Sequence, residues 1–262
     1  MNIIVCIKQV PDTNELRIDP ETGNLIREGV PSIINPYDKH AVEEAVVIKE
    51  KHGGKVTVIT MGPPQAEEAL RECLAMGADE AILLSDKAFS GADTSATSYT
   101  LGIAAHEIGE FDLILCGQEA LDGNTAQVGP QLAEFLDLPQ ITYVQSVEIN
   151  GNTLKAKKAL EDGYEVLETE LPALLTITKD INVPRIPSID AVMNAYQEKE
   201  IITWTADGLP VDRGRIGLRG SPTRIMKAHT PELKRGQVEI IDGSLDKAVH
   251  TLVARLGEKH LV

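Results

Sequence analysis

Residues 111–136 read FDLILCGQEALDGNTAQVGPQLAEFL, and this stretch decides the fold. It opens with an apolar run, Phe111 to Cys116, which is typical of a buried strand. It closes with apolar residues at helical spacing, from Leu132 to Leu136. A polar, glycine-containing loop without Lys or Arg joins the two runs. The whole is therefore a strand–loop–helix unit of the kind that builds parallel sheets.

The chain before this unit repeats the same alternation. Strands are predicted over residues 3–8, 55–61 and 80–84. Helices are predicted from Asp38, as N-cap, to His52, from the GPPQ of residues 62–65 to Gly77, and from Asp93 or Thr94 to Gly109. We therefore expect an α/β fold: a doubly wound, mostly parallel sheet with helices on both faces.

The character of the sequence changes in the second half. Residues 142–180 alternate in polarity around Asn-Gly-Asn and Asp-Gly turns, which predicts an antiparallel ribbon returning to a last core strand at Ala173–Thr178. Periodicity then fades, apart from a helical pattern at Leu245–Leu256. We expect residues 1–183 to form a nucleotide-binding α/β domain, and residues 184–262 to form an extended C-terminal arm that covers another surface.

The charge of the chain limits its partners. The 262 residues include 40 Asp and Glu against 25 Lys and Arg, a net charge of -15. Such a surface argues against nucleic acid or an anionic membrane as the main partner, because phosphate groups attract positive surfaces. One segment differs: Arg213–Arg235 holds seven basic residues and one acidic residue. Composition leaves open whether this segment binds an anion, binds a partner or faces solvent.

Nothing in the sequence indicates secretion, membrane insertion or a metal site. Three cysteines, an odd number without a CxxC motif, indicate a reduced, intracellular chain. The N-terminal MNIIVCIKQV lacks a basic leader and is typical of a strand, and no apolar run approaches the ~20 residues that span a bilayer. The six histidines do not pair at metal-binding spacing. We therefore expect a cytoplasmic protein with no membrane insertion.

Ligands of doubly wound sheets bind beyond the carboxyl ends of the strands. Three segments are predicted to lie there: Lys8–Val10, Met61–Pro63 and Cys116–Gln127. The last combines free backbone N–H groups with the positive end of a helix dipole, which suits a phosphate. Within it, Gly117 and Gly123 would let the backbone approach a ligand closely.

The side chains of this loop add hydrogen-bonding groups. Donors to phosphate oxygens and acceptors for ribose hydroxyls or a base are both present: Asn124, Thr125 and Gln127 in the first group, Glu119 and Asp122 in the second. The Gly129–Pro130 pair either kinks a helix that begins at Thr125 or marks the true start of the helix. A well-capped loop without a ligand is the alternative, and we favour nucleotide binding on the strand–loop–helix context.

NPYDKHA, residues 35–41, is a second candidate. Either Asp38 only caps its helix, or Asn35 and Asp38 face the same cleft as Cys6 and Met61. No Walker A sequence, no GxGxxG after a strand and no GxSxG elbow occurs, and no nucleophile stands with a base. We therefore predict no catalytic residues and expect a bound cofactor to carry the chemistry.

AKKALEDGYEVLETELPALLT, residues 156–176, resembles the signature of the β subunit of electron transfer flavoproteins, the FixA family. The positions that fit are Lys157 or Lys158, Glu161–Gly163, Glu165, Leu167 and Pro172–Thr176. Residues 34–51, 61–79 and 117–136 are similar to the same family, so the resemblance covers essentially the whole chain. It implies a heterodimer with an α subunit that carries FAD, with the C-terminal arm wrapped around that partner.

The resemblance also implies a nucleotide cleft in this chain. Its cofactor-binding residues would be Cys6, Asn35, Pro36, Tyr37, Asp38, Met61, Gly117, Gln118, Glu119, Ala120, Leu121, Asp122, Gly123, Asn124, Thr125, Ala126, Gln127 and Val128. Many members hold a structural AMP there, whereas electron-bifurcating members hold a second FAD with NADH docking beside it. LDGNTAQVGPQ, residues 121–131, resembles the anaerobic or nitrogen-fixation type, so we expect FAD, with AMP as the alternative.

Electron bifurcation is then the implied function. NADH would deliver an electron pair, of which one electron goes to ferredoxin or flavodoxin. The other would pass through the flavin of the α subunit to an acyl-CoA dehydrogenase or a quinone reductase. Two alternatives stay open: a non-bifurcating subunit with AMP that shuttles single electrons from acyl-CoA dehydrogenases, and a stand-alone adenine-nucleotide-binding signalling protein.

VPRIPSIDAVMNAYQ, residues 183–197, resembles the family's recognition loop, which docks partner dehydrogenases. Ile189 falls where an apolar anchor is usual, and Met193 is its second predicted docking residue. Asn194 and Gln197 stand where some relatives have lysines, so docking on an acidic dehydrogenase face is expected to differ here. A short surface helix after a proline-rich turn is the alternative interpretation.

Overall fold

The computed structural model describes residues 1–12, 17–18, 25–26, 31–224, 226 and 240–262. The chain divides into two compact units. The first comprises Met1–Arg17 and Leu25–Met226, and the second comprises Ile18–Asn24 and Lys227–Val262.

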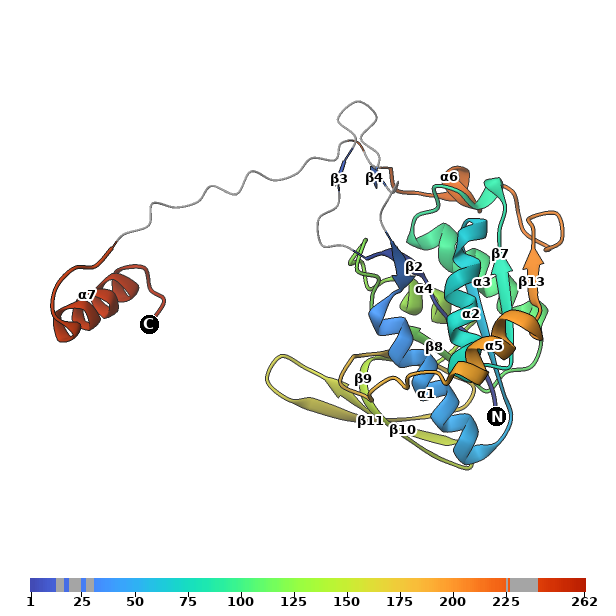
Figure 1. Cartoon of the computed structure of the whole chain (residues 1–262), viewed down its shortest axis with the longest axis horizontal. Coiled ribbons are helices and arrows are strands. Elements are labelled where there is room, and N and C mark those ends of the chain that lie inside the picture. The colour runs from blue at the N-terminus through green and yellow to red at the C-terminus, as the bar shows by residue number, and fades with distance from the viewer. Residues whose placement is uncertain (13–16, 19–24, 27–30, 225, 227–239) are drawn as a thin grey trace. The chain divides into compact units, whose positions relative to one another are not determined.

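A nine-stranded sheet forms the centre of the first unit, in the order β11-β10-β9-β12-β8-β1-β6-β7-β13 (Figure 1). Parallel pairing joins β1 (Asn2–Cys6), β6 (Lys55–Met61), β7 (Glu80–Leu84), β8 (Leu113–Gly117), β12 (Ala173–Ile177) and β13 (Ile201–Trp204). Strand β9 (Gln140–Asn150) joins them as a seventh parallel strand through β12, and it pairs antiparallel with β10 (Thr153–Ala159), which pairs with β11 (Tyr164–Glu170). The predicted parallel sheet with an antiparallel ribbon is confirmed.

Helices cover both faces of this sheet, as a doubly wound fold requires. Helices α1 (Pro36–His52) and α2 (Glu67–Met76) pack on one face, and α3 (Thr94–Ile108) and α4 (Val128–Phe135) pack on the other (Figure 1). Side chains alternate along each strand, so Ile3 and Val5 face the first helix pair while Ile4 and Cys6 face the second. The core is mainly aliphatic on both faces, with Phe89 and Tyr99 buried on the second.

The remaining elements are short. They are β2 (Gln9–Pro11), paired with β5 (Ser32–Ile34), β3 (Arg17–Ile18), paired with β4 (Leu25–Ile26), the 3₁₀ turns η1 (Pro64–Ala66) and η2 (Lys87–Phe89), and α6 (Gly217–Gly220).

Local sequence signals account for the helix ends. Gly53 and Gly77 follow α1 and α2 with positive φ angles, and Asp93 caps α3 by accepting from the amide of Ala96 at 3.0 Å. Helix α4 begins at Val128, so Gly129–Pro130 mark the start of the helix. Proline fits in this first turn because its missing amide hydrogen has no partner to lose there.

Three described elements beyond residue 183 belong to the first unit, namely α6, β13 and the helix α5 (Ile189–Gln197). Helix α5 packs on α2, and β13 pairs in parallel with β7 at the sheet edge. Periodicity did not predict β13, because a four-residue edge strand with an exposed Ile202 shows no alternating pattern. The boundary between residues 183 and 184 stays a prediction.

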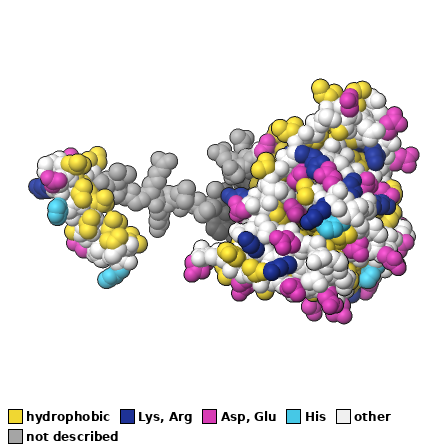
Figure 2. Space-filling view, turned by 90° about the horizontal axis from the view of Figure 1, so that it is seen from below, with side chains coloured by type: hydrophobic (Ala, Val, Ile, Leu, Met, Phe, Trp, Pro, Cys, Tyr) yellow, Lys and Arg dark blue, Asp and Glu magenta, His cyan; other side chains and the backbone are white. Residues whose placement is uncertain are grey.

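The second unit contributes α7 (Leu245–Glu258), which confirms the helix predicted there. None of its residues is buried. Leu245, Val249, Leu252 and Val253 are all exposed, and Figure 2 shows hydrophobic side chains along this helix. An amphipathic helix with an open apolar face is typical of a segment that packs on another surface.

Candidate functional site

The topology of the sheet predicts a crevice beside β1. From β1 the chain continues to β6 and β7 on one side and returns to β8 and β12 on the other, so the loops after β1 and β8 diverge. Such a switch point at the carboxyl ends of parallel strands is where this architecture binds ligands. The predicted cofactor-binding residues surround it, since they follow β1, β6 and β8 or begin α1.

Asp38 connects the two sides of this switch point. The structure corrects its predicted role as N-cap: helix α1 begins at Pro36, and Asp38 lies inside the first turn. Its carboxylate accepts from the backbone amide of Lys8 at 2.7 Å and from that of Gly117 at 3.1 Å. One buried side chain thus joins the end of β1 to the end of β8.

Asn35 extends this connection to the loop after β8. Its side-chain nitrogen donates to Asp38 Oδ1 at 2.9 Å and to the carbonyl of Glu119 at 2.8 Å, and its oxygen accepts from the amide of Leu121 at 3.1 Å. Asn35 is fully buried, and these three hydrogen bonds give partners to both the nitrogen and the oxygen of its side-chain amide. The first part of the loop is therefore fixed by helix α1.

The glycines of the loop have different roles. A Cβ atom on Gly117 would lie 2.2 Å from Asp38 Oδ1, so glycine is required there for the contact with Asp38 rather than for a ligand. A Cβ atom on Gly123 would meet no atom within 4 Å among the described residues. Of the two glycines, only Gly123 has enough free space around it, in the described part of the chain, for a ligand to approach the backbone as predicted.

Burial raises the pKa of Asp38 to about 7, despite the three donors, which lower it. The backbone amides of Lys8 and Gly117 and the side-chain NH₂ of Asn35 all donate to the carboxylate, and none of these groups can accept a hydrogen bond from the neutral acid. The donors around Asp38 therefore favour the ionised carboxylate, whereas the burial of Asp38 favours the neutral acid.

The tip of the loop adopts an uncommon backbone. Asn124 and Ala126 have φ angles of 44° and 52°, in the left-handed region that favours glycine. The side-chain nitrogen of Asn124, in the orientation that satisfies both ends of its amide, donates to the carbonyls of Ala120 at 3.1 Å and Leu121 at 3.3 Å. Asn124 therefore supports the turn itself. Such strain persists where the surrounding structure determines the loop, and it clusters at functional sites.

Lys8 belongs to one of the three segments predicted to lie here, but it was not among the predicted cofactor-binding residues. Its ammonium contacts both oxygens of Asp122, at 2.6 and 2.7 Å, and so joins the loop tip to the end of β1. Its position at the end of the predicted strand of residues 3–8 was the available signal. A lysine at a strand end is too common to single out without the structure.

Four consecutive backbone amides lead into α4, those of Thr125, Ala126, Gln127 and Val128. Within the described ranges of the chain, none of them has a hydrogen-bond acceptor. Unsatisfied amides at a helix start, together with the dipole, are the usual seat of a phosphate. The residues present therefore fit the diphosphate of a dinucleotide.

The other predicted residues line the same region. Cys6 lies opposite Cys116 in the register of β1 and β8, and both side chains are buried in the core under α3 and α4. The hydrogen bond with Cys6 and burial raise the pKa of the Cys116 thiol, so the Cys116 thiol stays neutral. Met61 and Tyr37 are half-buried, and burial with nearby Glu119 raises the pKa of Tyr37.

The predicted docking residues lie apart from the crevice, on α5. Ile189 is 80% exposed and Met193 is 50% exposed, and Ile186 just before the helix is 94% exposed. Exposed apolar side chains gathered on one short helix are typical of a protein contact.

One member of the basic segment has a structural role. The guanidinium of Arg215 lies 4.0 Å from the ring centre of Tyr99 and 5.6 Å from that of Phe135. It therefore packs residue 215 onto helices α3 and α4 through cation–π contacts. Residue 225 and residues 227–239 of this segment lie outside the described residues.

The comparisons with known proteins agree on one family. Residues 22–209 match the electron transfer flavoprotein domain. The chain is 59% identical over its full length to the full-length electron transfer flavoprotein subunit beta of Thermoanaerobacterium thermosaccharolyticum. It is 49% identical, again over the whole of both chains, to the caffeyl-CoA reductase-Etf complex subunit CarD of Acetobacterium woodii. It is 42% identical over both full lengths to the acryloyl-CoA reductase electron transfer subunit gamma of Anaerotignum propionicum. In the described part of the chain, no helix is long and apolar enough to cross a membrane.

Proposed function

This chain belongs to the β-subunit family of electron transfer flavoproteins, and from that premise we propose that it binds FAD in the crevice beside β1 and takes part in electron bifurcation. It would accept an electron pair from NADH. It would then pass one electron to ferredoxin or flavodoxin and one, through the flavin of an α subunit, to an acyl-CoA dehydrogenase or quinone reductase. Bound FAD would supply the conversion between electron pairs and single electrons.

The free amides of Thr125–Val128 carry this proposal. They lie at the switch point of the sheet and at the start of α4, and no described residue accepts from them. The left-handed residues Asn124 and Ala126 hold the backbone in this orientation. Side chains along the same loop, Glu119 and Asp122, supply acceptors for ribose hydroxyls.

The protein would bind and position the cofactor without proton chemistry of its own. Asp38 and Asn35 would hold the loop at a fixed distance from β1, and Lys8 would hold its tip through Asp122. Cys6 and Met61 would border the crevice from the ends of β1 and β6. The printed names of two relatives refer to caffeyl-CoA and acryloyl-CoA reductases, which supports an electron route to enzymes of CoA esters.

Contacts with partners would use surfaces outside the crevice. The apolar face of α7 would pack on the α subunit, as expected for the C-terminal arm, and α5 would dock the dehydrogenase through Ile189 and Met193. The protein would act in the cytoplasm, where NADH and reduced ferredoxin are available.

Cofactor extraction from the co-expressed heterodimer tests the function. Two FAD per heterodimer, with loss of flavin absorbance on adding NADH, are the expected result. One FAD with one AMP would replace the proposal by the non-bifurcating alternative. Purification without an α subunit, with an adenine nucleotide bound, would instead favour a stand-alone nucleotide-binding protein.

A further inference from the structure

Helix α5 ends without the signals that usually stabilise a helix C-terminus. Its C-cap is Glu198 in a right-handed conformation instead of a glycine, and its last turn holds no basic residue. The last carbonyls of the helix therefore lack a local partner for their partial negative charge.

Arg71 of helix α2 supplies that partner from another element. Its Nη1 donates to the carbonyl of Ala195 and to that of Lys199, both at 2.6 Å, across more than a hundred residues of the chain. Its Nε and Nη2 donate to Glu67 on its own helix, which fixes the guanidinium plane. The Arg71 side chain is 15% exposed, so these bonds are largely shielded from water.

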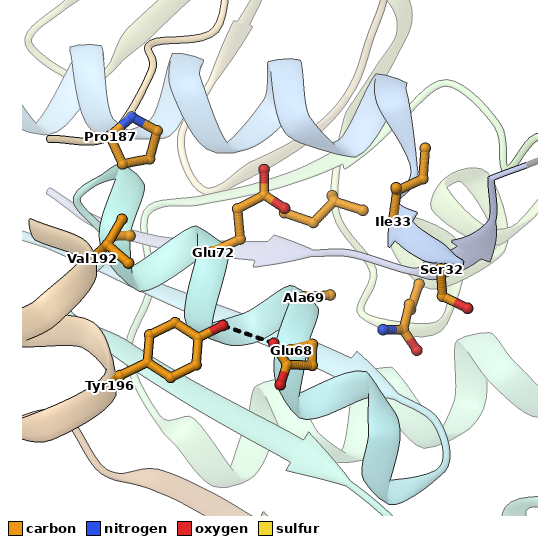
Figure 3. Close-up of a pocket in the computed structure, with 11 residues that line it drawn as sticks. Ser32, Ile33, Glu68, Ala69, Glu72, Pro187, Val192 and Tyr196 are labelled. Atoms are coloured by element: carbon orange, nitrogen blue, oxygen red, sulfur yellow. Dashed lines mark hydrogen bonds between the residues drawn. The ribbon is translucent and has the colours of Figure 1, made fainter. Parts of the chain in front are cut away.

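A second contact joins the same two helices. The phenol of Tyr196 donates to Glu68 Oε2 at 2.7 Å (Figure 3). Its ring lies 5.9 Å from the Arg71 guanidinium. Beside this contact, an open groove of about 250 Å³ separates Val192 of α5 from Ile33 of β5. The N-terminal part of α5 thus borders a groove, and α2 holds its C-terminal part.

We infer that Arg71 is a positioning residue for partner docking: by capping α5 it holds the exposed Ile189 and Met193 in the orientation that a dehydrogenase recognises. This inference rests on the proposed docking role of α5. Arg71 does not touch the partner, because its guanidinium is directed at the carbonyls of Ala195 and Lys199. Preorganisation of the apolar face reduces the ordering cost of association.

The test uses the α–β heterodimer and an acyl-CoA dehydrogenase that it reduces. Lysine keeps the charge of Arg71 but cannot reproduce its planar fork, so Arg71→Lys should raise the KM for the heterodimer about tenfold with kcat unchanged. Flavin content should stay at the wild-type level, and amide exchange of residues 195–199 should become faster. Arg213→Lys, which alters an exposed pair with Asp207, is the matched control.

A double mutant separates the inference from the docking proposal. If Arg71 acts through the exposed face of α5, Arg71→Lys adds almost nothing to the KM of Ile189→Ala. Two results would overturn the role of Arg71 and leave docking by α5 in place. One is a double mutant whose KM increase equals the product of the two single increases, and the other is an unchanged KM for Arg71→Lys while Ile189→Ala raises the KM. An unchanged KM for Ile189→Ala would overturn both.

Discussion

Asp38 Oδ1 accepts a hydrogen bond from the backbone amide of Gly117 at 3.1 Å, between residues 79 positions apart. The second carboxylate oxygen accepts from the amide of Lys8. This buried group therefore fixes the spacing of the two loops between which the proposed cofactor site opens. It also makes that spacing depend on the protonation of one carboxylate.

The first prediction concerns pH. Burial raises the pKa of folded Asp38 to about 7 from an ordinary value of 3.8, so between these values the folded state holds more protons than the unfolded state. This group makes the free energy of unfolding fall as pH rises from about 4 to about 7. Urea unfolding at several pH values should show that fall in the wild-type protein and a flatter profile in Asp38→Asn. Equal slopes in the two proteins would contradict the prediction.

A pair of glycine substitutions separates packing from ligand approach. Gly117→Ala places a methyl group 2.2 Å from Asp38 Oδ1, and overpacking of this kind costs about 1–3 kcal/mol of the free energy of unfolding. Gly123→Ala meets no described atom within 4 Å and should leave stability unchanged. If the backbone at Gly123 approaches the cofactor, this variant should still bind less FAD. Thermal denaturation and flavin content measure the two effects.

The Lys8–Asp122 ion pair should affect cofactor retention more than stability. Lys8 is 47% exposed, and exposed pairs contribute about 0–1 kcal/mol, so Lys8→Gln should change the melting temperature little. Freeing the loop tip should speed the release of FAD from this subunit after dilution. Lys55→Gln is the control, since its pair with Glu80 lies at the amino ends of the strands. If the two variants release FAD at the same rate, the Lys8–Asp122 ion pair does not help to retain the cofactor.

Strong periodic signals explain why so much of the fold was predictable. Helix α2 ends before Gly77 because glycine adopts the left-handed conformation there, and β6 coincides with its apolar run of residues 55–61. Strand β13 carries no such signal, because its place in the sheet depends on pairing with β7 rather than on its own pattern. The parallel register of β9 with β12 is likewise a tertiary property.

The candidate site likewise has features that the sequence predicts and features that depend on tertiary contacts. The loop between β8 and α4 was recognisable because it is polar and follows a strand. The hydrogen-bond partners of the surrounding side chains were not recognisable. In the sequence Asp38 looks like an N-cap, and it can accept from Lys8 and Gly117 only because β1 and β8 are adjacent in the fold. Arg71 gave no signal at all, because its acceptors are backbone carbonyls far along the chain.

The exposed residues of α5 allow a direct test of docking. Ile189→Ala removes most of an apolar side chain that is 80% exposed, so the subunit should keep its stability and flavin. Loss of a central apolar contact typically costs about 1–3 kcal/mol of binding, which should raise the KM for the dehydrogenase roughly tenfold or more. Val166→Ala, at a side chain that is 48% exposed on β11 and lies outside the recognition loop, is the control and should leave the KM unchanged. Equal KM values would exclude α5 as the docking site.

The last prediction concerns α7, whose apolar face has no partner among the described residues. Leu252→Glu introduces a charge on that face, whereas His250→Glu introduces one on the polar side of the same helix. If the arm packs on the α subunit, the first change should weaken the heterodimer and the second should not, because only the first places an unpaired carboxylate in an apolar contact. Sedimentation of the two heterodimers over a range of concentrations measures the difference. Since no residue of α7 is buried, neither change should lower the melting temperature of the isolated β subunit, and an equal shift of both heterodimers would place the contact elsewhere on the chain.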